Sequence, residues 1–530
     1  MKRWNGWGYE AVSFTLSEKA YGFISGKIGK AVPLPDAPLS EVLEQVPESR
    51  LPEHPLVLTD PEGRLRHARG QSLPDWLALR SGHIGVFPDG VSYPVSGEEV
   101  RRLLEYARGA KAVVIPYGGG TSVVGHINPE RNSMPVLTVD TGRMNRLLSL
   151  DKESQVATFG AGADGPAVEA QLRAHGYTLG HFPQSFEFSR LGGWIATRSS
   201  GQQSLGYGKI ERLFAGGRLE TPAGTLDIPD FPASATGPDL REMVLGSEGR
   251  LGILTEVKMR VTPLPEKEKF HVLFFPEWRA AVDAVRTAVQ DRIMLSMLRL
   301  SNPLETQTQL VLAGHERLVS LLEKVIARRG AGVDKCMLTF GITGSRRQFR
   351  MVKRQALRVF KRAGGIYAGT YMGRKWAEKR FHVPYLRNSL WEKGYAVDTL
   401  ETAINWQKST QMMESMETAL GAALSIENER IHVFSHLSHL YPQGSSIYTT
   451  YLFRIGDTFE KTFERWKRLK TAASEAIVAN GGTISHHHGV GVDHAAYLEA
   501  EKGKLGMAAI ESLCRRFDPD GIMNPGKLVR

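Results

Sequence analysis

The sequence predicts an α+β protein of two domains, in which the second domain carries an antiparallel sheet with helices on one face. At 530 residues the chain exceeds the length that one hydrophobic core usually supports. Segments with strand-like and helix-like patterns alternate along it. A proline- and charge-rich junction at residues 262–270, TPLPEKEKF, divides this alternation into two blocks.

Four regions follow from these patterns. Residues 1–85 are expected to form an N-terminal arm with short helices, and residues 86–264 a β-rich α+β domain that opens with the amphipathic helix EEVRRLLEYARGA. Residues 265–480 alternate between strands and helices and are expected to form the second domain. Residues 481–530 return to glycine-rich text before a last helix.

The composition is that of an ordinary soluble globular protein, with 42% hydrophobic and 23% charged residues. A net charge of +11 favours anionic partners, namely phosphorylated small molecules, an anionic membrane surface or nucleic acid. No nucleic acid is expected, because no known nucleic-acid-binding motif accompanies the charge. The two cysteines lie far apart in sequence and suggest neither a disulfide framework nor a zinc site.

No apolar run reaches transmembrane length, and no apolar leader segment follows the basic N-terminus. We therefore expect a cytoplasmic protein, with peripheral contact to a membrane left open. A basic amphipathic helix at Arg346–Arg362 could make that contact, although such a helix is more often the solvated outer face of a sheet domain.

The stretch Tyr177–Arg212 is dense in Gly, Ser, Thr and Gln and is too long for an ordinary loop. Such a segment is typical of a chain that runs along a ligand, because glycine lets the backbone approach closely and short hydroxyls donate and accept hydrogen bonds. The alternative is an irregular surface loop.

Two further glycine loops support the ligand hypothesis. Pro116–Ser122, PYGGGTS, follows a predicted strand, and successive backbone N–H groups there could converge on a pyrophosphate. It matches neither a Rossmann nor a Walker motif. Residues 246–252, GSEGRLG, offer the same flexible backbone. Each loop alone could be a hairpin turn, whereas three such loops in one domain favour a dinucleotide site.

His486, His487 and His488 form a triple histidine on a loop. Adjacent side chains on a loop point in different directions and lack the usual metal-ligand spacing, so no metal site is expected. Hydrogen bonding or proton transfer beside a cofactor is the favoured interpretation, and a polar surface turn is the alternative. We expect a further group, His432, His436 and His439, to be structural.

PYGGGTS, GHFPQSFEFSRLGGWIATRSSGQQSLGYGKIE, TGPDLREMVLGSEGRLGILTE and SHHHGVG together resemble the flavoproteins of the vanillyl-alcohol oxidase superfamily. The resemblance is strongest to the alkyldihydroxyacetonephosphate synthase (alkylglycerone-phosphate synthase) family and runs from Trp4 nearly to the C-terminus. It implies a PCMH-type FAD-binding domain of two α+β subdomains, a cap domain with an antiparallel sheet, and a C-terminal segment that returns to the FAD site.

Carried over by position, the resemblance implies FAD contacts from four segments of the first domain. These are Pro116, Tyr117, Gly118, Gly119, Gly120, Thr121 and Ser122; Gln184, Ser185, Phe186, Glu187, Phe188, Ser189 and Arg190; Thr197, Arg198, Ser199 and Ser200; and Glu248, Gly249, Arg250, Leu251, Gly252, Ile253 and Leu254. The catalytic residues that it implies are Tyr448, His181, His486, His487, His488, Arg387 and Arg299.

The reaction implied is ether-lipid synthesis, in which acyl-dihydroxyacetone phosphate exchanges its acyl group for a fatty alcohol through a flavin N5 adduct without net redox change. A lipid phosphate ester and a fatty alcohol are the expected substrates, and a homodimer the expected assembly. A base must remove a proton beside the ketone, and a Tyr448 phenolate would be favoured by nearby positive charge. Tyr451 remains an alternative for this role. Arg387 and Arg299 could hold phosphate or carboxylate through paired hydrogen bonds.

The sequence departs from the family pattern at Gln184, Asp493 and His494, and its ending MNPGKLV is more similar to flavin-dependent 2-hydroxy-acid dehydrogenases. Two alternatives therefore remain. One is an FAD-dependent 2-hydroxy-acid or alcohol dehydrogenase or oxidase of the same superfamily, and the other is a non-catalytic flavin- or lipid-binding protein.

Overall fold

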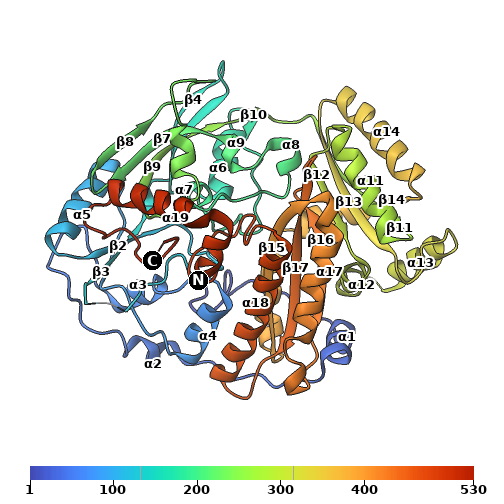
Figure 1. Cartoon of the computed structure of the whole chain (residues 1–530), viewed down its shortest axis with the longest axis horizontal. Helices are drawn as coiled ribbons and strands as arrows, with labels where there is room; N and C mark the ends of the chain where they lie inside the picture. Colours follow the sequence, from blue (N-terminus) through green and yellow to red (C-terminus); the bar gives the residue numbers. More distant parts are fainter. Residues whose placement is uncertain (132, 314–315, 530) are drawn as a thin grey trace.

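The strands form four separate sheets among the described residues, and Figure 1 shows how helices accompany them. The computed structural model describes residues 1–131, 133–313 and 316–529, and in this part of the chain the sheets have three, five, two and seven strands. Helices accompany each of the larger sheets, so the predicted α+β class is confirmed.

The N-terminal arm carries short helices, as expected, and lies against both sheet domains. Its helices are α1 (Glu18–Ile28), α2 (Leu39–Leu43), α3 (Pro61–Arg66) and α4 (Leu73–Ser81). A capping box, in which Ser72 and Asp75 hydrogen-bond each other's backbone N–H groups, begins α4. Trp76 of α4 packs against Trp391 of the second domain, with ring centroids 6.5 Å apart.

The first domain contains a parallel and an antiparallel sheet. The parallel sheet has the order β1-β3-β2 and consists of β1 (Gly90–Ser92), β2 (Val113–Tyr117) and β3 (Val136–Asp140). The antiparallel sheet has the order β4-β5-β9-β7-β8 and consists of β4 (Leu147–Asp151), β5 (Val156–Gly160), β7 (Phe214–Thr221), β8 (Gly224–Ile228) and β9 (Ile253–Arg260). A short ribbon pairs β6 (Tyr177–Thr178) with β10 (Thr262–Pro263).

Helices cover these sheets, and several of them are short. They are α5 (Gly97–Gly109), α6 (Gly165–Arg173), α7 (Leu191–Ala196), α8 (Ser204–Tyr207), α9 (Ile210–Leu213) and α10 (Leu240–Val244), with a 3-10 turn at Thr141–Arg143. The stretch Tyr177–Arg212 therefore contains one short strand and three short helices between its loops. Buried Trp194 and Ile195 of α7 anchor it in the core of the antiparallel sheet.

The second domain is built on an antiparallel sheet of order β14-β11-β13-β12-β16-β17-β15. Its strands are β11 (Lys267–Phe275), β12 (Met297–Ser301), β13 (Cys336–Gly344), β14 (Ile366–Gly369), β15 (Tyr395–Asn405), β16 (His432–Ser438) and β17 (Gly444–Arg454). The first of them, β11, begins inside the proline-rich junction.

The long helices of this domain pack on one face of its sheet. These are α11 (Trp278–Gln290), α14 (Arg346–Arg362), α17 (Trp406–Ala422) and α18 (Phe459–Asn480). The other face is covered at one end by α12 (Pro303–Leu312) and α13 (Glu316–Ala327), an addition that the strand and helix pattern did not predict. The remaining helices are α15 (Tyr371–Lys379), α16 (Leu386–Trp391) and α19 (Leu498–Phe517), with 3-10 turns at Val383–Tyr385, Ser425–Glu427 and Ala495–Tyr497.

Successive side chains of β17 point alternately to the core of the second domain and to the candidate site. Ile447, Tyr451 and Phe453 belong to the core beneath the helices, whereas Tyr448 and Thr450 line a cavity on the opposite face. Among the described residues, no helix is both long and apolar enough to cross a membrane.

Candidate active site

A cavity of about 630 Å³ lies where the first domain, the N-terminal arm and the second domain meet, on the side of the second domain's sheet that faces away from its long helices. Its first wall is formed by the loop that follows β2 and by the stretch Tyr177–Arg212. Its second wall consists of residues from the strands β12, β15, β16 and β17 and from the helices α12, α15 and α16. Asn524 from the C-terminal segment also lines it.

The glycine loop after β2 approaches its neighbours too closely for any side chain. A Cβ atom on Gly119 would lie 1.7 Å from the carbonyl oxygen of Phe188. Gly120 has a φ of +70°, in the left-handed region that favours glycine. Backbone N–H groups in such a loop remain free to face a phosphate.

This wall fits FAD. Residues from four separate glycine- or serine-containing segments line one continuous surface, as an extended dinucleotide requires. The Oδ1 atom of Asn524 is buried at the same wall and has no hydrogen-bond partner among the described residues. A bound cofactor can satisfy such a group.

The structure brings most of the predicted cofactor residues to the cavity. Those that line it are Pro116, Tyr117, Gly118, Gly119, Gly120, Thr121, Ser122, Gln184, Ser185, Ser189, Arg190, Thr197, Ser199, Ser200, Glu248, Gly249, Gly252, Ile253 and Leu254. The remaining residues of these segments lie behind the wall. Phe186 stacks on Phe381, Phe188 packs against Trp7, Arg198 pairs with Glu242, Arg250 donates to the carbonyl oxygen of Met523, Leu251 belongs to the core, and Glu187 is half-buried.

Tyr448 lines the cavity between three imidazole rings. It stacks on His436 at 5.0 Å between ring centroids, lies 6.1 Å from His487, and meets His488 edge-on at 5.8 Å. Its hydroxyl donates to Thr399 Oγ1 at 3.1 Å. Burial raises the pKa of Tyr448 to about 12, so the expected phenolate is not favoured in this pocket without a ligand.

Tyr451 lies on the other face of the same strand. Its ring is fully buried in the core, and its hydroxyl donates to Asp398 Oδ2 at 3.1 Å. Residues three apart on a strand point to opposite faces, so Tyr448 alone of the two tyrosines lines the cavity.

The two predicted arginines both line the cavity but are held differently. Arg299 Nη2 lies 2.7 Å from Glu305 Oε1, so its charge already has a buried carboxylate partner. Arg387 donates from Nη1 to the carbonyl oxygen of Gln71 at 2.8 Å, and its guanidinium lies 4.2 Å from the ring centroid of Trp76. Its Nη2 atom is buried without a partner among the described residues.

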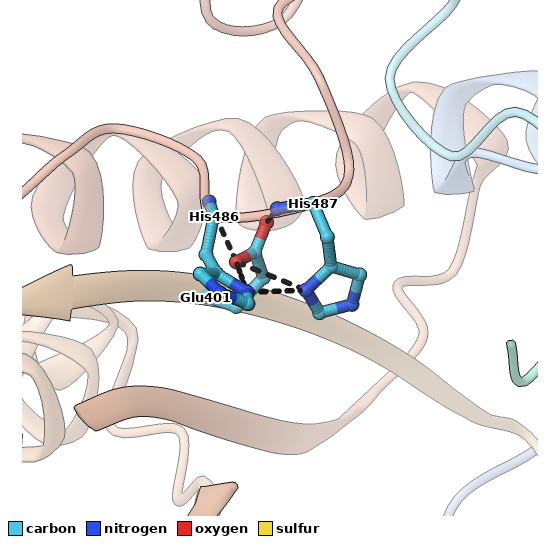
Figure 2. Close-up of side chains that lie close together, drawn as sticks. All are labelled: Glu401, His486 and His487. Carbon is cyan, nitrogen blue, oxygen red and sulfur yellow. Dashed lines mark hydrogen bonds and ion pairs between the residues drawn. The ribbon is translucent and has the colours of Figure 1, made fainter. Parts of the chain in front are cut away.

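One carboxylate organises the triple histidine loop (Figure 2). Glu401 on β15 has a fully buried side chain. It accepts hydrogen bonds from Ser485 Oγ and from the backbone N–H groups of the three histidines, at 2.7 to 3.0 Å. Burial opposes its ionisation, but the neighbouring histidines, His487 first, hold the pKa of Glu401 well below its usual range.

The loop divides its three histidines between the cavity and the protein interior. His487 and His488 line the cavity, whereas His486 points to Tyr441, with Nε2 2.6 Å from the tyrosine hydroxyl. Glu401, His486 and His487 also bring one potential metal-ligand atom each within 4.8 Å of the others. This grouping did not follow from the sequence, because Glu401 is distant along the chain and neighbouring histidines were expected to diverge.

His181 lies behind the cavity wall. It is 1% exposed, its Nε2 atom is 3.2 Å from Ser199 Oγ, and its ring packs on Trp194 at 4.7 Å. Burial lowers the pKa of His181 to about 3, so the ring is neutral, and it contacts the cavity-lining residues Ser199 and Trp194.

Two of the histidines that were expected to be structural line the cavity instead. His436 lies beside Glu305, with Nδ1 3.0 Å from Oε1, and His439 Nδ1 lies 3.0 Å from the hydroxyl of Ser200 and 2.9 Å from that of Ser204. His432 is buried against Thr308 and does not line the cavity. The strand was expected to scatter these rings, but residues 432 and 436 share the cavity-side face of β16.

Sequence reasoning missed the contribution of the N-terminal arm. Trp7, Phe14 and Ile24 line the cavity, and Gln71 and Trp76 hold Arg387. It also missed His126, whose Nδ1 atom is 2.8 Å from Ser122 Oγ. A histidine four residues after the PYGGGTS loop was the one available signal.

Comparison with known proteins identifies the family. Residues 88–227 match the model of the FAD binding domain, and residues 264–528 match the model of the C-terminal domain of FAD linked oxidases. An alkyldihydroxyacetonephosphate synthase of Dictyostelium discoideum is 31% identical over 477 residues, which are 89% of this chain and 78% of the relative.

Solved structures agree. A structure of alkyldihydroxyacetonephosphate synthase superposes with a TM-score of 0.85 at 27% identity and covers 99% of this chain and 98% of its own. p-Cresol methylhydroxylase, at 14% identity and a TM-score of 0.69 over 94% of this chain and 99% of its own, shares the fold. The chain uses FAD and belongs to the alkyldihydroxyacetonephosphate synthase family of FAD-linked enzymes.

Proposed function

We propose that this protein is an FAD-dependent alkylglycerone-phosphate synthase, which replaces the acyl group of acyl-dihydroxyacetone phosphate with a fatty alcohol. The observation that carries the proposal is the single cavity in which the FAD-fitting wall faces an unpaired guanidinium, a buried tyrosine and a set of imidazoles. Family membership supports the same reaction.

The cavity-lining residues of the four glycine- and serine-containing segments would hold FAD. The loop Pro116–Ser122 would cradle its phosphates through backbone N–H groups. When bound there, FAD supplies an electrophilic, redox-active ring system to the reacting carbon.

Arg387 is the residue best prepared to bind the anionic part of the substrate. No carboxylate pairs with it among the described residues, and one of its guanidinium nitrogens is buried without a partner at the cavity wall. A phosphate or a departing carboxylate would satisfy that nitrogen through a charge-assisted hydrogen bond. Arg299, which is already paired with Glu305, would assist Arg387 from β12, because both side chains line the cavity.

Tyr448 would act as the base that removes the proton beside the ketone, in exchange with the imidazoles around it. Because burial holds the pKa of Tyr448 near 12, and a nearby anion would raise it further, the hydroxyl must pass its proton to a neighbouring base. His436, His487 and His488 are the rings within reach of that exchange.

An apolar part of the cavity suits an aliphatic chain. Phe14 and Ile24 of the N-terminal arm line it together with Leu390, Phe434 and Leu452 of the second domain. Burial of methylene groups against such side chains contributes about 0.8 kcal/mol each.

The same proposal includes a lipid phosphate ester and a fatty alcohol as substrates, a homodimer, and peripheral contact with a membrane. The exposed basic side chains of α14 support the membrane contact. We also propose the functional division predicted from the sequence: an arm over residues 1–85, an FAD-binding domain over 86–264, a cap over 265–480, and a returning segment over 481–530. The cytoplasmic location stays a prediction.

The test is to purify the protein with its flavin and supply acyl-dihydroxyacetone phosphate with labelled fatty alcohol under anaerobic conditions. The expected result is incorporation of label into the lipid while the flavin remains oxidised at the end. Rapid bleaching of the flavin by a 2-hydroxy acid or an alcohol, with no incorporation, would replace the proposal by a dehydrogenase. Purified protein that lacks flavin and activity would instead indicate a binding protein.

A further inference from the structure

A chain of close contacts leads from the cavity toward the surface through the triple histidine loop. His487 lines the cavity, and its Nδ1 atom lies 2.9 Å from Nδ1 of His486. On the far side of the His486 ring, Nε2 lies 2.6 Å from the hydroxyl of Tyr441. Tyr441 is half-buried, and the two residues after it, Pro442 and Gln443, are exposed.

We propose that His487, His486 and Tyr441 form a proton relay between the cavity and solvent. This inference rests on the proposed function, because that exchange turns an uncharged carboxylic ester group and an alcohol into an ether, a carboxylate and one proton. The proton must leave a site that is closed by two domains. The relay deepens the proposed function by assigning the exit route of that proton.

The contacts allow the transfer with every proton accounted for. The alcohol O–H bond breaks, and its proton binds Nε2 of His487. The Nδ1 proton of His487 passes to Nδ1 of His486, the Nε2 proton of His486 passes to the oxygen of Tyr441, and the hydroxyl proton of Tyr441 passes to water. Each group gains one proton and loses one, so all three end neutral.

The surroundings favour the neutral forms of His486 and Tyr441. Burial, with the nearby charge of Lys209, lowers the pKa of His486 well below its usual range, and burial raises the pKa of Tyr441, so neither group is held in a charged form. Among the described residues, none hydrogen-bonds Nε2 of His487, which leaves that atom available to a substrate.

Glu401 is the positioning residue of this relay. Its carboxylate accepts from the backbone N–H groups of His486 and His487 at 2.7 and 3.0 Å, which fixes the loop. Its Oε2 atom lies 3.4 Å from Nδ1 of His487 and would stabilise a transient positive charge on that ring (Figure 2).

The test compares the flavin-loaded enzyme with Tyr441→Phe, which keeps the ring and removes the hydroxyl. Tyr106→Phe is the matched control, because it also removes a tyrosine hydroxyl bonded at 2.6 Å but lies on the first domain away from the cavity. We expect Tyr441→Phe to retain its flavin and KM but to lose about tenfold or more in kcat, with an altered solvent deuterium isotope effect and recovery by added imidazole. The Tyr106→Phe variant should match the wild type.

A second readout does not depend on turnover. In protein labelled with ¹⁵N-histidine, a continuous relay predicts that Tyr441→Phe shifts the ring nitrogens of both His486 and His487, and that Glu401→Gln broadens both. A wild type that exchanges label alongside an equally active Tyr441→Phe variant would overturn the relay. The relay would also be overturned if the ring nitrogens of His487 did not shift in Tyr441→Phe. It would be overturned as well if the wild type bound one equivalent of metal that Glu401→Gln lost. If the wild type fails to exchange label, the proposed reaction is refuted, and with it the role of the relay in that reaction. The shifts of the histidine nitrogens would still decide whether the chain of contacts exists.

Discussion

At the scale of single residues, Tyr448 is defined by the face of β17 on which it lies. Its neighbours on that face are imidazoles and a threonine hydroxyl, whereas Tyr451 on the other face contacts Asp398 and the core. The two tyrosines are three residues apart and have different physical roles.

The first prediction separates these roles. Tyr448→Phe should retain FAD and stability but lower kcat by about 100-fold or more, because it removes the group proposed as base. Tyr451→Phe should keep kcat and lower the free energy of unfolding by about 1 to 3 kcal/mol, because Asp398 loses a buried donor. Steady-state kinetics and denaturant unfolding of both variants measure the difference. Full activity of Tyr448→Phe would contradict the base assignment.

Asp493 is a departure from the family pattern that carries a stability cost. Burial raises its pKa from the ordinary 3.8 to about 6, and its Oδ2 atom is buried without a partner among the described residues. The folded state therefore binds the proton of Asp493 more tightly than the unfolded chain does. Protonated Asp493 favours the folded state at low pH, and this contribution to stability is lost as the pH rises from about 4 to about 6.

The second prediction follows from that sign. Asp493→Asn should stabilise the protein by about 2 kcal/mol at pH 7.5 and should have little effect near pH 4. The stabilisation is smaller than the whole pKa shift would give, because Asp493 is partly exposed. Denaturant unfolding at the two pH values measures this. The control is Asp457→Asn, whose side chain is 77% exposed. Equal stabilisation of Asp493→Asn at both pH values would contradict the assignment.

Gln184 shows why a departure can be compatible with the site. Its amide donates to the carbonyl oxygen of Arg380 at 2.8 Å and accepts from Gln202 at 3.0 Å. An aspartate in its place could not donate to that carbonyl group. The glutamine therefore ties the wall of the first domain to the second domain.

At the scale of elements, the loop after β2 depends on the absence of side chains. The third prediction is that Gly119→Ala purifies with little or no flavin, because its Cβ would collide with the carbonyl oxygen of Phe188 and displace the loop. Gly109→Ala on α5 is the control, since a Cβ there meets nothing within 4 Å. Visible absorbance per protein measures flavin content. A normal flavin content in Gly119→Ala would show that this loop does not hold FAD.

Helix α14 has a buried apolar stripe and an exposed basic face. Arg350, Arg354 and Arg358 are exposed and form no ion pair among the described residues. The fourth prediction is that reversing these three charges to Glu weakens binding to anionic vesicles by about 100-fold or more, at about 1 kcal/mol for each basic residue near the surface. Sedimentation with vesicles measures it, and binding to neutral vesicles should not change.

A control for this prediction reverses the same number of charges elsewhere. Lys111, Arg146 and Lys152 are exposed on the first domain, so their change to Glu alters net charge equally. Similar losses in both triple variants would indicate a general charge effect and would contradict a docking role for α14.

At the scale of the whole molecule, the cavity joins parts of the chain that lie more than 400 residues apart. Gly119 and Asn524 both line it, and Asn524 donates to the carbonyl oxygens of Glu248 and His126. A cofactor that binds in this cavity therefore binds the folded protein and not the unfolded chain, in which these residues lie far apart.

The fifth prediction is that FAD raises the thermal unfolding temperature of flavin-stripped protein in a concentration-dependent way. The stabilisation should be about 2.7 kcal/mol when free FAD exceeds its Kd a hundredfold. Calorimetry with added FAD measures it, and riboflavin, which lacks the phosphates and adenosine, is the control. Equal stabilisation by riboflavin would show that the glycine loop does not bind the phosphates.

Local patterns predicted individual elements well where a strong local signal exists. Arg346–Arg362 forms the predicted amphipathic helix, because its apolar residues recur at helical spacing and Ser345 caps its first turn. The sequence predicts that Tyr177–Arg212 runs along a ligand, but it does not predict the three short helices there, because glycine and serine disfavour helices unless tertiary packing holds them, as burial of Trp194 does.

The site was predictable in its cofactor wall and only partly so in its chemistry. A glycine loop indicates, from a few consecutive residues, that the backbone approaches a ligand or a neighbour closely. The family resemblance placed Tyr448, Arg299, Arg387 and the triple histidine in one site. The partners that tune them, Glu401, Tyr441, Glu305 and Gln71, carry no local signal, because each comes from a different part of the chain. The predicted roles of the site residues stay predictions.

The sequence by itself determined the α+β class, the FAD cofactor and the family, because these depend on periodicity and on motifs a few residues long. Only the tertiary structure decided which tyrosine meets the cavity, which arginine keeps an unpaired nitrogen, and which carboxylate holds the histidine loop. Strand register and burial settle those questions. Both arise from contacts between residues that are distant along the chain and adjacent only after folding.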